Sequence, residues 1–119
     1  MTIGDSEIKV MQILWNTPEQ ALQAKEISSI ANKMYNWNKN TTYTLIKRCI
    51  QKQAISREDP NFICHALITK EEIQAQEVEK LTNKLFDGSS ELLFSSLLSN
   101  KGLSNDKIEA LKTLINTFK

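Results

Sequence analysis

The segment from Trp37 to Ile50 carries closely spaced side chains that can hydrogen-bond to nucleic acid. Asn38 can accept hydrogen bonds from the free N–H groups of a first helical turn, so we expect one short helix to begin there. At about 100° per residue, one arc of that helix holds only amide, hydroxyl, phenol and basic groups. This polar arc contains Asn40, Tyr43, Thr44, Lys47, Arg48 and Gln51. Such groups bond to base edges or pair with phosphates, which indicates recognition of DNA.

The opposite arc of the same helix is suited to a protein core, because its width of roughly 100° is that of a usual buried stripe. Its residues are Thr42, Leu45, Ile46 and Cys49. The surrounding sequence is basic, since six Lys or Arg and no Asp or Glu occur from Lys33 to Arg57. A solvated surface helix is the alternative interpretation, but such helices usually mix acids with bases. The pattern therefore favours a helix that contacts DNA.

Charge is unevenly distributed along the 119 residues, although the net charge is only +1. Residues 1–69 hold eight Lys or Arg against six Asp or Glu, whereas residues 70–119 hold seven against eight. The positive excess therefore surrounds the predicted helix, as a DNA footprint would. The length suggests one domain, or a small domain with an appendage.

Several classes of protein are disfavoured by what the sequence lacks. No apolar run approaches the roughly 18 residues of a membrane span, and Asp5 and Glu7 interrupt any secretory leader. We therefore expect a cytoplasmic protein without membrane insertion. Cys49 and Cys64 fit no zinc spacing and His65 is the only histidine, so no metal site and no cofactor are expected. With three glycines, no phosphate loop and no nucleophile arranged with His65, an enzyme is not expected either.

The elements around the central helix predict a winged helix-turn-helix. Asp5 can cap a first helix that runs to about Trp15, and a second helix is expected over residues 24–33. Residues 21–23 are too short to assign and are compatible with an edge strand. An extended segment, a turn at residues 58–61 and a strand-like run at residues 62–68 follow the central helix. A hairpin after a recognition helix is a wing, so residues 1–69 form the predicted DNA-binding domain.

Residues 70–119 predict three further helices, so the fold class is mainly α, with a small β-hairpin wing. Their apolar residues cannot all be buried within fifty residues, and exposing so much apolar area is unusual for a monomer. We therefore expect a helical dimerisation domain that closes against a second copy. The alternative is that this segment folds back on the winged helix. The expected dimerisation residues are Leu81, Leu85, Leu93, Leu97, Ile108, Leu111, Ile115 and Phe118.

Several motifs in order place the sequence in a known family. The run Trp37–Cys49 is similar to W-S-x-x-T-[VI]-x-T-L-[LI]-x-R-L, and Glu7–Trp15 is similar to E-x-x-V-M-x-I-[IL]-W. Ala24–Ile27 matches A-x-E-I, Asn83–Gly88 resembles N-K-[LV]-[YF]-x-G, and Asp106–Leu111 resembles an E-I-E-E-L run. The chain thus resembles, over nearly its whole length, the BlaI/MecI/CopY family of bacterial transcriptional repressors, the penicillinase repressor family.

The resemblance implies a homodimer that binds a palindromic double-stranded operator through the central helix. Matched residue by residue, the base-reading positions are Asn40, Tyr43, Thr44 and Arg48. Thr41 and Lys47 lie beside them as phosphate or base contacts, and Arg57 with the wing contacts the DNA backbone. Tyr43 departs from the arginine of the β-lactam repressors, and tyrosine cannot make arginine's bidentate contact to guanine.

The family also suggests how repression ends. In the β-lactam repressors a membrane sensor-protease cuts an Asn-Phe bond, and the matching residues here are Ser96 and Leu97. The four-cysteine cluster of copper-responsive members has no counterpart after Cys64. The resemblance thus implies a repressor of a β-lactamase or other antibiotic-resistance operon, derepressed by cleavage or loosening of the tail. The alternatives are a winged-helix module that binds protein and a regulator of a non-resistance operon.

Overall fold

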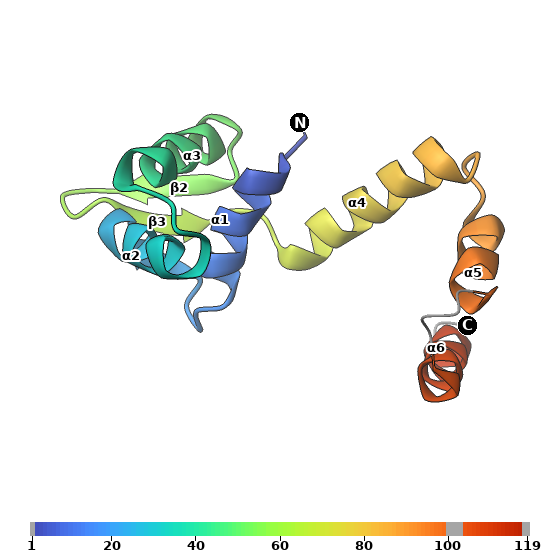
Figure 1. Cartoon of the computed structure of the whole chain (residues 1–119). Coiled ribbons are helices and arrows are strands. Elements are labelled where there is room, and N and C mark those ends of the chain that lie inside the picture. The colour runs from blue at the N-terminus through green and yellow to red at the C-terminus, as the bar shows by residue number, and fades with distance from the viewer. Residues whose placement is uncertain (1, 100–103, 118–119) are drawn as a thin grey trace. The chain divides into compact units, whose positions relative to one another are not determined.

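The computed structural model describes residues 2–99 and 104–117 and divides the chain into two compact units, residues 1–75 and 76–119. Figure 1 shows the elements coloured in chain order, with every element except β1 labelled. They are α1 (Asp5–Trp15), β1 (Ala21–Gln23), α2 (Ala24–Tyr35), α3 (Lys39–Gln51), β2 (Ile55–Glu58), β3 (Ile63–Ala66), α4 (Lys70–Leu85), α5 (Ser90–Ser99) and α6 (Asn105–Thr117). A mainly helical chain with a small sheet confirms the predicted fold class.

A three-stranded antiparallel sheet in the order β1–β3–β2 forms the wing and its support. β3 pairs with β2 so that Ser56 lies opposite His65, and with β1 so that Leu22 lies opposite Cys64. The segment at residues 21–23 is therefore an edge strand. The hairpin of β2 and β3 follows α3 directly, and α3 packs on β2. This arrangement is that of a winged helix-turn-helix.

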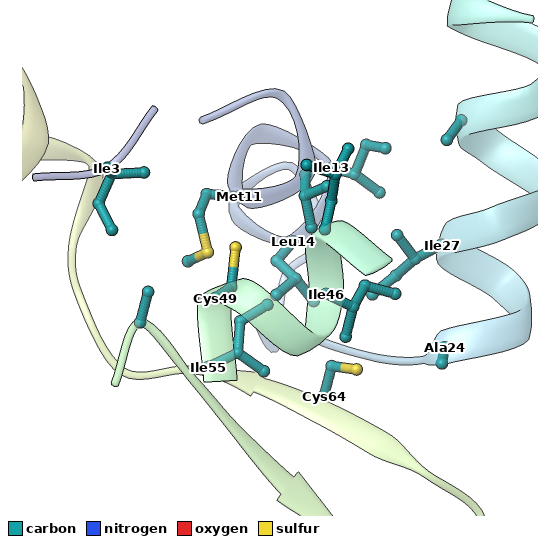
Figure 2. Close-up of a cluster of buried hydrophobic side chains, with 14 of the residues drawn as sticks. Ile3, Met11, Ile13, Leu14, Ala24, Ile27, Ile46, Cys49, Ile55 and Cys64 are labelled. Atoms are coloured by element: carbon teal, nitrogen blue, oxygen red, sulfur yellow. The ribbon is translucent and has the colours of Figure 1, made fainter. Parts of the chain in front are cut away.

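The core of the first unit lies among α1, α2, α3 and the strands (Figure 2). Met11 and Leu14 from α1, Ile27 from α2 and Ile46 from α3 have almost no exposed surface. Burying such a side chain stabilises the fold by about 1.5–3 kcal/mol relative to leaving it exposed. All four residues that the helical period placed inward on α3 are buried, which confirms the predicted orientation of this helix.

The start of α1 differs from the prediction. Gly4, not Asp5, is the N-cap residue, and its N–H donates to Oε1 of Glu7 at 2.7 Å. The expected cap at Asp5 is wrong because Glu7, three residues into the helix, already reaches back to the free backbone donor. Asp5 instead becomes the first helical residue, where the positive end of the helix dipole favours a carboxylate.

The second unit contains the C-terminal part of α4, followed by α5 and α6. α4 ends at a left-handed turn, in which Gly88 has φ +75° and its N–H donates to the carbonyl of Thr82 at 3.0 Å. No residue of α5 is buried, although Leu92, Phe94 and Leu98 belong to it. Among the residues described, no helix combines the length and apolar character needed to cross a membrane.

Candidate nucleic-acid interface

The N-terminal end of α3 is held by its cap. The side-chain oxygen of Asn38 accepts from the Thr41 N–H at 2.8 Å, and the Asn38 carbonyl accepts from the Thr42 N–H at 3.2 Å. Asn38 thus satisfies donors that the helix leaves free in its first turn. The cap fixes the first turn of the helix, which carries the exposed residues Asn40 and Thr41.

An open depression of about 400 Å³ lies along the outer face of α3. Its lining residues are Ser6, Trp37, Asn38, Asn40, Thr41, Thr44, Leu45 and Arg48. Four residues predicted to contact DNA thus line one surface, and Lys47 is exposed on the same helix. Ser6, at the start of α1, was missed by sequence reasoning because its approach to α3 is set by tertiary packing. Apart from Trp37 and Leu45, the lining residues carry amide, hydroxyl and guanidinium groups, which suit a base edge or a phosphate.

Tyr43 and Arg57 lie toward the wing and are connected through Phe62. The Tyr43 and Phe62 rings meet edge to face, with centroids 5.9 Å apart. The Arg57 guanidinium lies 3.6 Å from the Phe62 centroid, and its Nε donates to Asp59 at 3.0 Å. Tyr43 is half-buried, whereas Asn40, Thr44 and Arg48 are exposed. Six of the seven predicted DNA-binding residues therefore form two groups, one along the depression and one between α3 and the wing, and Lys47 belongs to neither.

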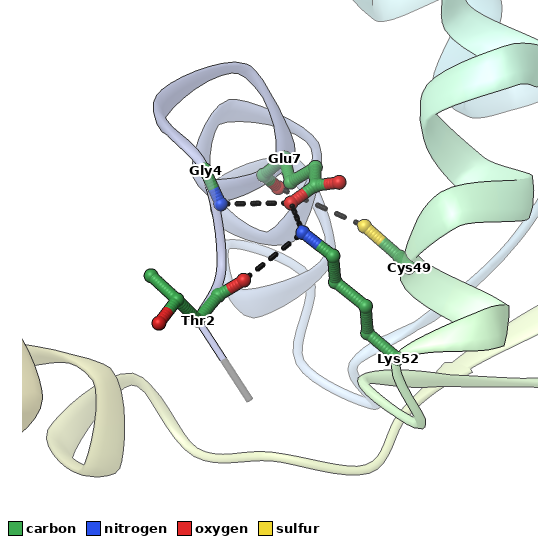
Figure 3. Close-up of polar contacts among 5 residues, drawn as sticks. All are labelled: Thr2, Gly4, Glu7, Cys49 and Lys52. Atoms are coloured by element: carbon green, nitrogen blue, oxygen red, sulfur yellow. Dashed lines mark hydrogen bonds and ion pairs between the residues drawn. The ribbon is translucent and has the colours of Figure 1, made fainter.

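A polar cluster joins the C-terminal end of α3 to the start of α1 (Figure 3). Lys52 Nζ lies 2.6 Å from the Glu7 carboxylate and donates to the Thr2 carbonyl at 2.9 Å. Burial by itself would raise the pKa of Glu7, but the bonds from Lys52 and from the Gly4 N–H outweigh it and lower that pKa below its ordinary value. Glu7 is therefore ionised at neutral pH, and the ion pair fixes the orientation of α3 against α1.

Cys49, Cys64 and His65 are the side chains that metal or redox chemistry would most readily use. Cys49 and Cys64 are free and buried, and burial raises their pKa values to about 12 and about 11. Both thiols are therefore protonated and unreactive at neutral pH. His65 Nε2 lies 3.0 Å from Glu58 across the hairpin. In the described parts of the chain, no three His, Cys, Asp or Glu side chains gather as a metal site would require.

The residues expected at a dimer interface lie in the second unit. Leu81 and Leu85 are 42% and 64% exposed, and Leu93, Leu97 and Ile108 are half-buried. Phe118 and the side chains of Leu111 and Ile115 lie outside what the structure describes. Val78, Leu92, Phe94 and Leu98 are further exposed apolar residues that the expected set did not include.

Comparison with known proteins gives consistent matches over nearly the whole length of the chain. A family model described as the penicillinase repressor matches residues 3–117. The chain is 28% identical to the methicillin resistance regulatory protein MecI of Mammaliicoccus sciuri, of Staphylococcus aureus (strain N315) and of Staphylococcus epidermidis. Each alignment spans 116 residues, which are 96% of this chain and 93% of the relative. The similarity therefore includes both units.

Proposed function

Because the chain belongs to the penicillinase repressor family, a family of transcriptional repressors and not of enzymes, we propose that it represses transcription as a homodimer bound to a palindromic operator. The observation that carries the proposal is the exposed face of α3. From Lys33 to Arg57 the sequence has six basic residues and no acid, and α3 presents Asn40, Thr44 and Arg48 in one open depression. The major groove of DNA is wide enough to admit such a helix.

We assign DNA binding to residues 1–69, with direct base contacts from the depression. An exposed arginine such as Arg48 suits bidentate contact to guanine, and an amide such as Asn40 suits adenine. We assign Thr41 and Lys47 to phosphates or neighbouring bases, and Arg57 on the wing to the DNA backbone. Phosphate contacts set the register of the helix on the duplex, and the base contacts give it sequence preference.

We assign dimerisation to residues 70–119. Leu81, Leu85, Phe94 and Leu98 are exposed in the single chain, and an interaction with a second copy would remove this apolar surface from water. Two linked recognition helices bind two half-sites, so each arm raises the effective concentration of the other. A dimer bound across a promoter blocks transcription sterically. This mechanism accounts for why a DNA-binding unit carries an apolar helical segment.

We propose that the regulated genes confer antibiotic resistance, as the names of the relatives state for those proteins, and that the repressor acts in the cytoplasm. Derepression would follow cleavage or loosening of the helical segment. Ser96 is exposed and Leu97 is half-buried, and both lie within α5. A membrane sensor-protease could cut this bond only after local unfolding of α5. The cut would then dissociate the dimer and weaken its binding to the operator.

The test is a salt titration of operator binding, using a dyad DNA fragment from the protein's own promoter. We expect two chains per site and an affinity that falls steeply between about 50 and 200 mM salt, because binding releases counterions. Arg48→Ala should weaken binding by about 1–3 kcal/mol and relax the base preference at one position. The matched control is Lys80→Ala, which removes the same charge from an exposed position on α4. Equal losses for both variants, or salt-insensitive binding to a protein partner instead, would contradict the proposal.

A further inference from the structure

Phe62 connects the wing to two helices of the first unit. It lies in the connection between β2 and β3, and its carbonyl accepts from the Ala24 N–H, at the start of α2, at 2.9 Å. Its φ of +49° is in the left-handed region, which non-glycine residues rarely adopt. A non-glycine residue in this conformation raises the free energy of the fold, so contacts from the surrounding structure must maintain it. The Phe62 ring has such contacts on both the α3 side and the wing side.

The contacts of Phe62 form a column in which the rings of Tyr43 and Phe62 lie between two cations, Lys39 and Arg57. Lys39 Nζ lies 5.4 Å from the Tyr43 centroid, and the Tyr43 and Phe62 planes cross at 87°. The Arg57 guanidinium then lies 3.6 Å from the Phe62 centroid. An edge-to-face ring pair and a cation over a ring face are both favourable arrangements for the aromatic quadrupole. The column therefore runs from the first turn of α3, through Phe62, to the β2 strand of the wing.

We infer that Tyr43 is a positioning residue that sets the wing against α3 through Phe62, and that it does not read a base. The inference rests on the proposed DNA-binding function. Tyr43 is half-buried and packed against Phe62, whereas the residues lining the depression on α3 do not include it. Arg57, held by the Phe62 face and by Asp59, is oriented before DNA arrives and loses less side-chain freedom on binding.

A positioning role makes a specific distinction between the ring and the hydroxyl of Tyr43. The contact with Phe62 needs only the aromatic ring, so Tyr43→Phe should preserve the column. Base reading by tyrosine would need the phenol oxygen, which Tyr43→Phe removes. Tyr43→Ala removes both. The two variants therefore separate the two roles at one position.

The experiment uses the full chain and two measurements. NMR of the free protein follows the side-chain protons of Arg57, which lie over the Phe62 ring and are shifted by it; Phe62→Leu identifies how much of the shift comes from that ring. Hydroxyl-radical footprinting on the operator follows protection of the phosphates at the wing. Tyr43→Ala should move the Arg57 signals toward their Phe62→Leu positions, remove the wing protection and weaken binding about tenfold. Tyr43→Phe should match the wild type in both measurements.

Thr44→Ala is the matched control, because it truncates the next residue of α3 on the depression side. It should weaken operator binding and leave the Arg57 signals unchanged. Loss of binding in Tyr43→Phe with unchanged Arg57 signals would overturn the inference in favour of base reading by the hydroxyl. Unchanged Arg57 signals in folded Tyr43→Ala would also overturn it. If the wild-type protein bound no DNA, the proposed function would fail, while the NMR measurement would still decide whether Tyr43 orders the wing.

Discussion

Lys52 illustrates how a single residue outside the proposed DNA-binding surface can help to position the helix that carries that surface. It directly follows α3, and its ammonium group pairs with Glu7, whose side chain is only 6% exposed. Sequence reasoning counted Lys52 among the basic residues around α3 and gave it no specific role. Local sequence patterns could not predict this ion pair, because Glu7 and Lys52 are 45 residues apart in the chain. In the structure, the contacts of Lys52 hold the C-terminal end of α3 against the start of α1.

Lys52→Met should destabilise the fold by about 1–3 kcal/mol at neutral pH, because the variant leaves a buried carboxylate without its charged partner. Urea denaturation measures this loss. The folded-state pKa of Glu7 lies below the ordinary value of 4.5, so the stabilisation is complete above that value and disappears as pH falls through the folded pKa. The difference between wild type and variant should therefore shrink in acid.

Two further variants test whether the pair is the cause. Lys47→Met removes the same charge from an exposed position of α3 and should change stability little. Adding Glu7→Gln to Lys52→Met should recover part of the loss, since a neutral amide can still accept from the Gly4 N–H. Equal destabilisation by Lys47→Met, or a loss from Lys52→Met that does not change with pH, would mean that the ion pair has little effect.

At the scale of elements, α3 was predictable because its determinants are local. Asn38 supplies a cap, and the 3.6-residue period separates the buried Thr42, Ile46 and Cys49 from the polar face. The wing was predictable from a turn cluster next to a β-branched run. The angular position of a residue on a helix, however, does not show which residues of other elements pack against its side chain. Tyr43 falls on the polar arc, yet Phe62, 19 residues later, packs against it.

Contacts between elements also explain why one residue of the depression was not predicted. Ser6 enters the depression because α1 packs on α3, and no pattern within either helix contains that information. The predicted start of α1 was wrong by one residue. Both the Asp5 carboxylate and the Glu7 carboxylate could accept from a free backbone N–H there, and Glu7 does so. The sequence thus predicts which faces the helices bury, whereas the composition of the site depends on contacts between elements.

Asn38→Ala should cost about 1 kcal/mol of stability, since it removes the acceptor of the Thr41 N–H. Asn38→Ser, which retains a capping oxygen, should remain close to the wild type. We also expect Asn38→Ala to weaken operator binding, because fraying of the first turn displaces Asn40 and Thr41. Thermal unfolding and binding titrations of both variants provide the check. An alanine variant as stable as the serine variant would show that the cap does not stabilise α3.

At the scale of the whole molecule, the two units differ in how far their apolar side chains are buried. The first unit buries side chains such as Leu14, Ile27 and Ile46 almost completely. In the described part of the second unit, Leu85, Leu92 and Phe94 remain 64%, 50% and 39% exposed. Such exposure in one chain is explained if a second copy covers it, as the proposed homodimer requires. The quantity that tests this explanation is the coupling between self-association and operator affinity.

Phe94→Asp should convert the dimer into a monomer, because a carboxylate in the apolar interface would be desolvated without a partner. Sedimentation equilibrium measures the association. Operator affinity should fall by about 10²–10⁴-fold, the contribution expected from linking two half-sites, although no residue of α3 or the wing has changed. Ser96→Asp places the same charge on an exposed, polar position of α5 and should leave both measurements near their wild-type values. A monomeric Phe94→Asp with full operator affinity would separate DNA binding from dimerisation. A dimeric Phe94→Asp would assign the exposed face of α5 to another partner.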